Sequence, residues 1–107
     1  MRQSIFKIAK EVFELASQKN SVIASAESCT GGLLSSAITG VPGSSLIFEC
    51  GFVTYSNFSK MKLLNVNQLT LESFGAVSEE VAAEMAIGAL KNSKANILNT
   101  KKEFNIF

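Results

Sequence analysis

The sequence predicts a single three-layer α/β domain, and three observations lead to that prediction. Amphipathic helical segments alternate with short apolar segments of strand character, a pattern typical of a sheet covered by helices on both faces. The chain has 107 residues, enough for one domain but not for two of ordinary size. Its composition, 47% hydrophobic and 18% charged, can supply a core. We therefore treat residues 1–107 as one domain.

The first part of the chain predicts a helix, a strand and a second helix. Apolar residues at helical spacing predict an amphipathic helix at about Gln3 to Gln18. The segment Ser21 to Ala26 is short and almost entirely apolar, which predicts a buried strand. Helical spacing resumes at Thr30 and continues to Gly40, which we expect to be the C-cap.

The middle of the chain predicts another strand and helix. Leu46 to Tyr55 is rich in aromatic and β-branched residues, as strands are, with Gly51 marking a bulge or a close approach. The segment Ser56 to Leu64 has helical character, and the Ser56 side chain can cap its first turn.

The last part predicts two helices and an incomplete sheet. A short helix ends at Gly75, and a longer one is capped by Ser78. The segment Ala95 to Leu98 starts like a further buried strand, but the polar residues after it do not continue the pattern. We therefore expect two or three strands, in a sheet left incomplete at the C-terminus.

Charge and hydropathy exclude several classes of protein. The net charge is +1 with no basic block, so nothing indicates nucleic-acid binding. No segment approaches the roughly 18 consecutive apolar residues that a membrane span needs. The N-terminal segment lacks the apolar core of a signal peptide. We therefore expect a cytoplasmic protein without a membrane partner.

The chain contains no histidine, which restricts its chemistry. A Ser-His-Asp triad and a Cys-His pair are both excluded, so a nucleophile must lose its proton to lysine, tyrosine, a carboxylate or water. The two cysteines, Cys29 and Cys50, are far apart in sequence, so we expect reduced thiols and no zinc site. We expect no cofactor.

The stretch AESCTGG, Ala26 to Gly32, holds more reactive groups than a turn requires. If it joins a strand to a helix, it lies where open α/β sheets bind ligands, beside the free N–H groups of a helix start. Ser28 and Thr30 supply hydroxyls and Cys29 a thiol, the weaker nucleophile candidate because no cation is near it in sequence. Alternatively, Ser28 or Thr30 merely caps the helix, and the glycines merely permit packing.

Tyr55 and Lys60 are the second group of candidates. They fall at the end of the second strand and one turn into the next helix. With a serine nearby they could form a relay without histidine, in which lysine is the base and tyrosine orients the proton. A surface lysine and a core aromatic residue are the plainer alternative. Cys50 we interpret as a small buried residue.

Four motifs occur together and resemble one known family. They are AESCTGG, VPGSS, GFVTYSN with a lysine three residues later, and GAVSEEVAAEMAIGAL. In this order and spacing they are similar to the C-terminal domain of the competence/damage-inducible protein CinA, a family that also exists as stand-alone nicotinamide-mononucleotide amidohydrolases. The similarity covers about residues 5–97. It implies a three-layer α/β/α domain, and hydrolysis of nicotinamide mononucleotide to nicotinate mononucleotide and ammonia without a metal, a reaction of NAD metabolism and pyridine nucleotide salvage.

The resemblance also implies a set of site residues. It makes Ser28 the nucleophile on the amide carbon, with Lys60 and Tyr55 handling the proton. The residues implied to bind substrate are Glu27, Thr30, Gly31, Gly32, Ser56 and Asn57. It further places the helix that starts near Thr30 against an oxyanion or the substrate phosphate.

The chain departs from the family pattern in its divergent tail, residues 98–107. Family members continue there into a glycine-rich loop, further strands and a final helix. We therefore expect a truncated domain, and two outcomes stay open: an active nicotinamide-nucleotide amidase, or a catalytically silent α/β module that self-associates. In either case an unpaired strand edge predicts a homodimer or a higher homo-oligomer.

Overall fold

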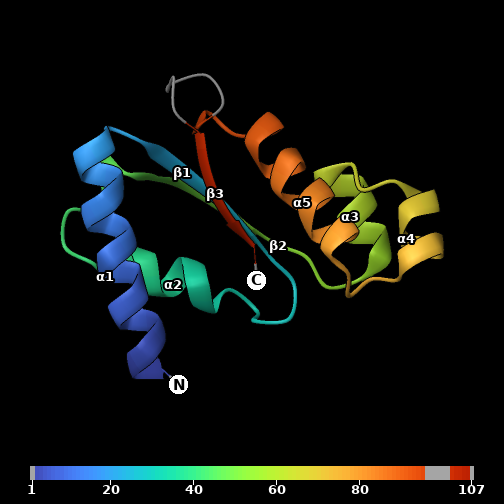
Figure 1. Ribbon diagram of the computed structural model, residues 1–107, viewed down its shortest axis with the longest axis horizontal. Helices are drawn as coiled ribbons and strands as arrows, with labels where there is room; N and C mark the ends of the chain where they lie inside the picture. Colours follow the sequence, from blue (N-terminus) through green and yellow to red (C-terminus); the bar gives the residue numbers. More distant parts are fainter. Residues whose placement is uncertain (1, 96–101, 107) are drawn as a thin grey trace.

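The computed structural model describes residues 2–95 and 102–106, and a parallel three-stranded sheet runs through the middle of it (Figure 1). The strands are β1 (Val22–Glu27), β2 (Phe48–Val53) and β3 (Lys102–Ile106). β1 is the central strand, and it pairs in parallel with β2 on one side and β3 on the other. The carboxyl ends of the strands therefore meet at one edge of the sheet.

Helices cover both faces of this sheet (Figure 1). One layer contains α1 (Arg2–Lys19) and α2 (Leu33–Thr39), and the other contains α3 (Asn57–Leu64), α4 (Gln68–Phe74) and α5 (Glu79–Lys91). A short 3-10 helix, Ser44–Leu46, precedes β2. In the part of the chain that the structure describes, no helix combines the length and the apolar character needed to cross a membrane. The predicted three-layer α/β/α fold is confirmed.

Side chains of β1 alternate between the two faces, and each face builds its own core. Ala24 and Ala26 belong to the core shared with α3 and α5, where Leu64, Val81 and Met85 pack. Ile23 belongs to the core shared with α1 and α2. The buried residues of that second core are Ala9, Ala16, Ile23, Leu34, Ala37, Ile38 and Ile47.

The four helix caps predicted from the sequence are confirmed. The side chains of Ser56 and Ser78 each accept a hydrogen bond from a first-turn backbone N–H, of Ser59 and Val81 respectively. Gly40 and Gly75 are the C-caps of α2 and α4.

The start of α2 differs from the prediction. The helix begins at Leu33 rather than at Thr30. Gly31 and Gly32 have φ of 65° and 101°, in the left-handed region, so a right-handed helix cannot pass through them. The stretch from Ser28 to Gly32 is therefore a turn in its own right.

Gly51 is a close approach, one of the two alternatives expected for it. A side chain there would collide with the hydroxyls of Ser35 and Ser25. β2 is also shorter than predicted, because Leu46 belongs to the 3-10 helix and the pairing with β1 ends at Val53.

The third strand comes from a segment that the sequence did not predict as a strand. Residues 96–98 of the expected strand Ala95 to Leu98 lie outside the described residues. β3 lies in the tail instead, where Phe104 and Ile106 alternate with polar residues and pair in register with Ala24 and Ala26. This short alternation of apolar and polar residues is the sequence signal for a strand in the tail.

Candidate functional site

The turn that carries Ser28 leaves the sheet at the carboxyl end of β1. Glu27 is the last residue of β1 and pairs with Val53 of β2. The backbone N–H of Thr54 donates to the Glu27 carbonyl over 2.9 Å. The segments that begin with Ser28 and Thr54 therefore leave the same sheet edge from neighbouring strands, as the sequence predicted for an open α/β sheet.

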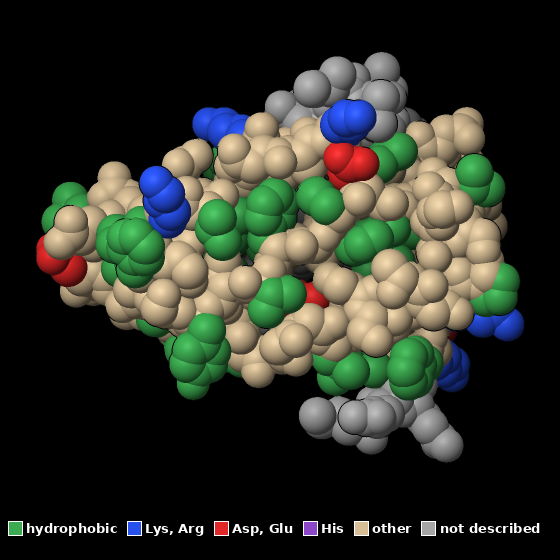
Figure 2. All heavy atoms as spheres, turned by 180° about the vertical axis from the view of Figure 1, so that it is seen from behind, with side chains coloured by type: hydrophobic (Ala, Val, Ile, Leu, Met, Phe, Trp, Pro, Cys, Tyr) green, Lys and Arg blue, Asp and Glu red, His purple; other side chains and the backbone are tan. Residues whose placement is uncertain are grey.

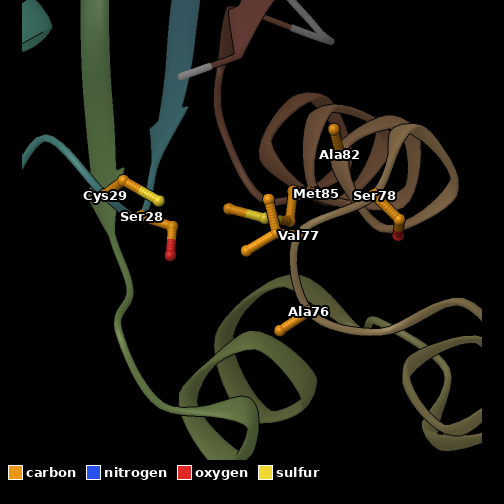
Figure 3. A pocket seen from close by; sticks show the side chains of 7 residues that line it. All are labelled: Ser28, Cys29, Ala76, Val77, Ser78, Ala82 and Met85. Atoms are coloured by element: carbon orange, nitrogen blue, oxygen red, sulfur yellow. The ribbon is translucent and has the colours of Figure 1, made fainter.

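Ser28 faces a small pocket between this turn and α5 (Figure 3). The pocket has a volume of about 110 Å³. Its lining residues are Ser28, Cys29, Ala76, Val77, Ser78, Ala82 and Met85. Ser28 is half-buried, and within residues 2–95 and 102–106 no hydrogen bond involves its hydroxyl. The prediction that Ser28 lies in a strand-to-helix turn and faces a pocket is confirmed.

The wall opposite Ser28 is apolar. Ala76, Val77, Ala82 and Met85 form it, and the Ser78 hydroxyl is occupied in capping α5, donating to the Gly75 carbonyl over 2.8 Å. A cavity of about 150 Å³ holds one benzene ring, whereas sites that enclose a drug-sized ligand measure about 300 Å³ or more. At about 110 Å³ the pocket is smaller than that benzene-sized cavity, so it can take a small group such as a carboxamide, but not a whole mononucleotide.

Glu27 is fully buried, and hydrogen bonds occupy both of its carboxylate oxygens. Oε1 accepts from the Thr30 hydroxyl and from the Leu34 N–H, each over 2.7 Å. Oε2 accepts from the N–H and the hydroxyl of Ser35, over 3.0 and 2.6 Å. Burial alone raises the pKa of this carboxyl, but the hydrogen bonds outweigh burial and hold the pKa below its ordinary value.

These hydrogen bonds change the expectation for the start of α2. The Leu34 and Ser35 N–H groups, expected to face an oxyanion or a phosphate, are occupied by Glu27. Glu27 and Thr30 direct their side chains at each other and not at the pocket. Their side chains hold the turn in place, whereas the resemblance implied substrate contacts.

Tyr55 and Lys60 lie together, but outside the lining of the Ser28 pocket. The Lys60 Nζ donates to the backbone carbonyl of Tyr55 over 3.2 Å, and Lys60 is only 3% exposed. The Tyr55 side chain is 85% exposed, so it is not the core aromatic of the plainer alternative. The structure joins this pair through the Tyr55 backbone, and in the described part of the chain no hydrogen bond links either residue to Ser28.

The remaining candidates from the sequence are spread over the same region. Ser56 caps α3 through its side chain. Asn57 lines a separate hollow between α3 and α4, together with Met61 and Gln68. Gly31 is exposed in the turn, with open space where a side chain would be.

Sequence reasoning missed several residues that shape the site. Ser25 and Ser35 join their hydroxyls over 3.1 Å beneath the turn. Val77 and Met85 also line the pocket. The sequence signal for this polar network is the spacing of Ser25 and Glu27. They lie two residues apart in an otherwise apolar strand, so both side chains point to the same face.

The two thiols differ in their surroundings. Cys29 is exposed beside the pocket, and Cys50 is half-buried in β2. Burial, together with the neighbouring Glu49 charge, raises the pKa of the Cys50 thiol, in keeping with a packing role. Among the described residues, no three His, Cys, Asp or Glu side chains form a group that could hold a metal ion.

Comparison with known proteins identifies the family. The model of the CinA C-terminal domain matches residues 5–98. A putative competence-damage inducible protein of Clostridioides difficile is 59% identical over 86 residues, which are 80% of this chain but only 21% of that protein. The chain spans about a fifth of the length of the curated relatives it matches.

Solved structures agree with this assignment. The competence/damage-inducible protein of Agrobacterium tumefaciens is 43% identical, with a TM-score of 0.80 over 86% of this chain and 56% of its own. A CinA superfamily protein of Escherichia coli is 40% identical, with a TM-score of 0.78 over 81% of this chain and 51% of its own. The chain therefore belongs to the CinA C-terminal domain family.

Proposed function

We propose that the chain is a nicotinamide-nucleotide amidohydrolase, which converts nicotinamide mononucleotide to nicotinate mononucleotide and ammonia. The observation that carries this proposal is the Ser28 hydroxyl, free of protein hydrogen bonds within the described residues and facing a small pocket. The carboxamide would enter that pocket beside Ser28, while the positively charged pyridinium ring, the ribose and the phosphate stay outside it.

Ser28 supplies the nucleophile in the proposed reaction. Its Oγ attacks the carboxamide carbon, the C–N bond breaks, and the nitrogen leaves as ammonia after taking up a proton. Water then hydrolyses the ester on Ser28, which releases the carboxylate and restores the hydroxyl. No histidine exists in the chain to move the proton.

Lys60 is the proposed proton acceptor, with Tyr55 beside it. Burial of Lys60 near the same sheet edge supports this role. Its Nζ is held by the Tyr55 carbonyl, so the proposal places a water molecule or the substrate between Lys60 and Ser28. A Lys60→Ala variant that keeps full turnover would remove Lys60 from the mechanism.

The test is release of ammonia and formation of nicotinate mononucleotide by the purified chain. We expect both products in equal amounts, and neither from a Ser28→Ala variant. Folded protein that releases no ammonia would overturn the proposal.

The second candidate function is a catalytically silent module that self-associates. The Ser28 pocket is small for a nucleotide, and Leu46, Tyr55 and Val77 are among several large apolar side chains exposed to solvent. Seen from behind, hydrophobic side chains reach the surface in separate groups, so this face does not itself single out a docking surface (Figure 2). We propose a homodimer, and light scattering that finds a monomer stable on dilution would overturn it.

A further inference from the structure

The residue next to Ser28 is a buried carboxylate that the proposed reaction does not use. Glu27 is 0% exposed, and it accepts four hydrogen bonds from three residues, Thr30, Leu34 and Ser35. Among the described residues, it makes no hydrogen bond to the pocket-lining groups opposite Ser28. Because Glu27 immediately precedes Ser28, these hydrogen bonds restrain the turn that carries Ser28.

The four hydrogen bonds close the turn on itself. Glu27 precedes the turn, Thr30 lies in its middle, and Leu34 and Ser35 follow it on α2. The turn contains two consecutive glycines at positive φ, which by themselves allow many conformations. The carboxylate therefore supplies the restraint that these glycines do not.

A second set of contacts, through Ser35 and Ser25, holds the Glu27 carboxylate in place. The Ser35 hydroxyl contacts Glu27 and lies 3.1 Å from the Ser25 hydroxyl, which is fully buried on β1. Gly51 of β2 leaves room for these two hydroxyls, since a side chain there would collide with both. The network thus joins β1 to α2 and packs against β2 at Gly51.

We propose that Glu27 is a positioning residue, whose carboxylate fixes the turn of residues 28–32 and thereby aims the Ser28 hydroxyl into the pocket. The catalytic consequence rests on the proposed function, whereas the structural consequence for the turn does not. Positioning of this kind raises turnover because the nucleophile spends more time in the reactive geometry.

The first test compares Glu27→Gln with Ser36→Ala, a control on the exposed side of α2. The amide keeps the shape of the carboxylate but places an NH₂ group against a donor, either the Ser35 N–H or the Leu34 N–H. The assay is run well below the melting temperature of each protein. We expect Glu27→Gln to lower kcat by up to about 100-fold and to leave KM nearly unchanged. Loss of folded protein without loss of kcat per folded molecule would show a merely structural role.

Thr30 provides a milder variant in case Glu27→Gln does not fold. Thr30→Val removes one hydrogen bond to Oε1, and Thr30→Ser keeps it. We expect Thr30→Ser to retain the wild-type kcat and Thr30→Val to lose part of it. Equal turnover in the two variants would contradict the proposal.

A second measurement needs no activity, so it separates this inference from the proposed function. Amide hydrogen exchange and chemical shifts of residues 28–35 are recorded by NMR for the wild type, Glu27→Gln and Ser36→Ala. We expect Glu27→Gln to speed exchange at Leu34 and Ser35 and also to shift the amides of residues 28–32. Changes confined to Leu34 and Ser35 would mean that Glu27 only caps α2, whatever the assay for ammonia shows.

Discussion

The two faces of β1 differ in chemistry, although their residues alternate along one strand. Toward α3 and α5 the strand presents Ala24 and Ala26, which pack in an apolar core. Toward α2 its carboxyl-terminal half presents Ser25 and Glu27, which join Ser35 in a hydrogen-bonded network, whereas Ile23, at the start of the same face, packs in an apolar core. The apolar face tolerates small changes where only neighbouring side chains have to move, whereas the polar face depends on every partner being present.

This difference explains how a chain of 107 residues holds an exposed, glycine-containing turn in place. The polar face fixes the base of the turn, and α5, which packs against the apolar face, supplies Met85 to the wall of the pocket opposite Ser28. Substitutions on the two faces should therefore change the stability of the fold for different reasons. Four sets of variants measure this difference.

The largest effect is expected on the apolar side, at Gly88 of α5. A side chain there would collide with the backbone of Leu64 on α3, and backbone cannot rotate away. We expect Gly88→Ala to lower the free energy of unfolding by about 3 kcal/mol, measured by urea denaturation. Gly40→Ala is the matched control and should be near neutral, because Gly40 has helical dihedrals and ordinary contact distances. A neutral Gly88→Ala would show that α3 and α5 are not in close contact.

The next effect concerns the charge on Glu27 and its dependence on pH. The folded-state pKa of Glu27 lies below that of the unfolded chain, so its stabilisation is complete above the unfolded pKa and is lost as pH falls through the folded pKa. We expect the wild type to be about 2 kcal/mol more stable than Glu27→Gln at neutral pH, and this gap to narrow in acid. Urea denaturation of both proteins across pH measures it, and a gap independent of pH would contradict an ionised Glu27.

A smaller effect is expected from the glycine on the polar face. The side chain of Gly51→Ala would meet the hydroxyls of Ser35 and Ser25, which can rotate, unlike the Leu64 backbone. We expect a loss of about 1–2 kcal/mol in the free energy of unfolding, accompanied by weaker protection of the Ser35 N–H in hydrogen exchange. A loss of stability without a change at Ser35 would separate Gly51 from the network.

The smallest effect is expected at Ser21, which lies just before β1. Among the described residues its buried hydroxyl has no hydrogen-bond partner, in contrast to the hydroxyls of Ser25 and Ser35. Ser21→Ala should be neutral or stabilise the fold by up to about 1 kcal/mol, and Ser35→Ala should destabilise it. Thermal unfolding of both variants measures the contrast, and a clear loss of stability in Ser21→Ala would indicate a hydrogen bond to a buried water.

The sequence predicted the fold well wherever local signals were strong. Periodic apolar residues and capping serines located α1, α3 and α5, and the fold class followed from their alternation with strands. It placed the start of α2 too early, because helical spacing does not show that Gly31 and Gly32 have positive φ. β3 was missed because five residues of weak alternation resemble a polar tail until β1 is known to lie beside them.

The candidate site was predicted less completely. Ser28 could be located because reactive residues cluster in one turn, and its pocket is confirmed. The inward orientation of Glu27 could not be predicted, because it depends on N–H groups seven and eight residues further along the chain. The opposite wall, from Val77 and Met85, depends on how α5 packs against the sheet, which no local pattern records.

The most direct test of the account is the ratio of kcat/KM for Ser28→Ala and Cys29→Ala with nicotinamide mononucleotide. The two side chains are neighbours in the same turn and line the same pocket, so a general disturbance of the pocket would affect both variants alike. We expect Ser28→Ala to lose at least about 1000-fold in kcat/KM, as loss of a nucleophile does, and Cys29→Ala to stay within a few-fold of the wild type. Equal losses in the two variants, or a larger loss in Cys29→Ala, would contradict the assignment of Ser28 as the nucleophile.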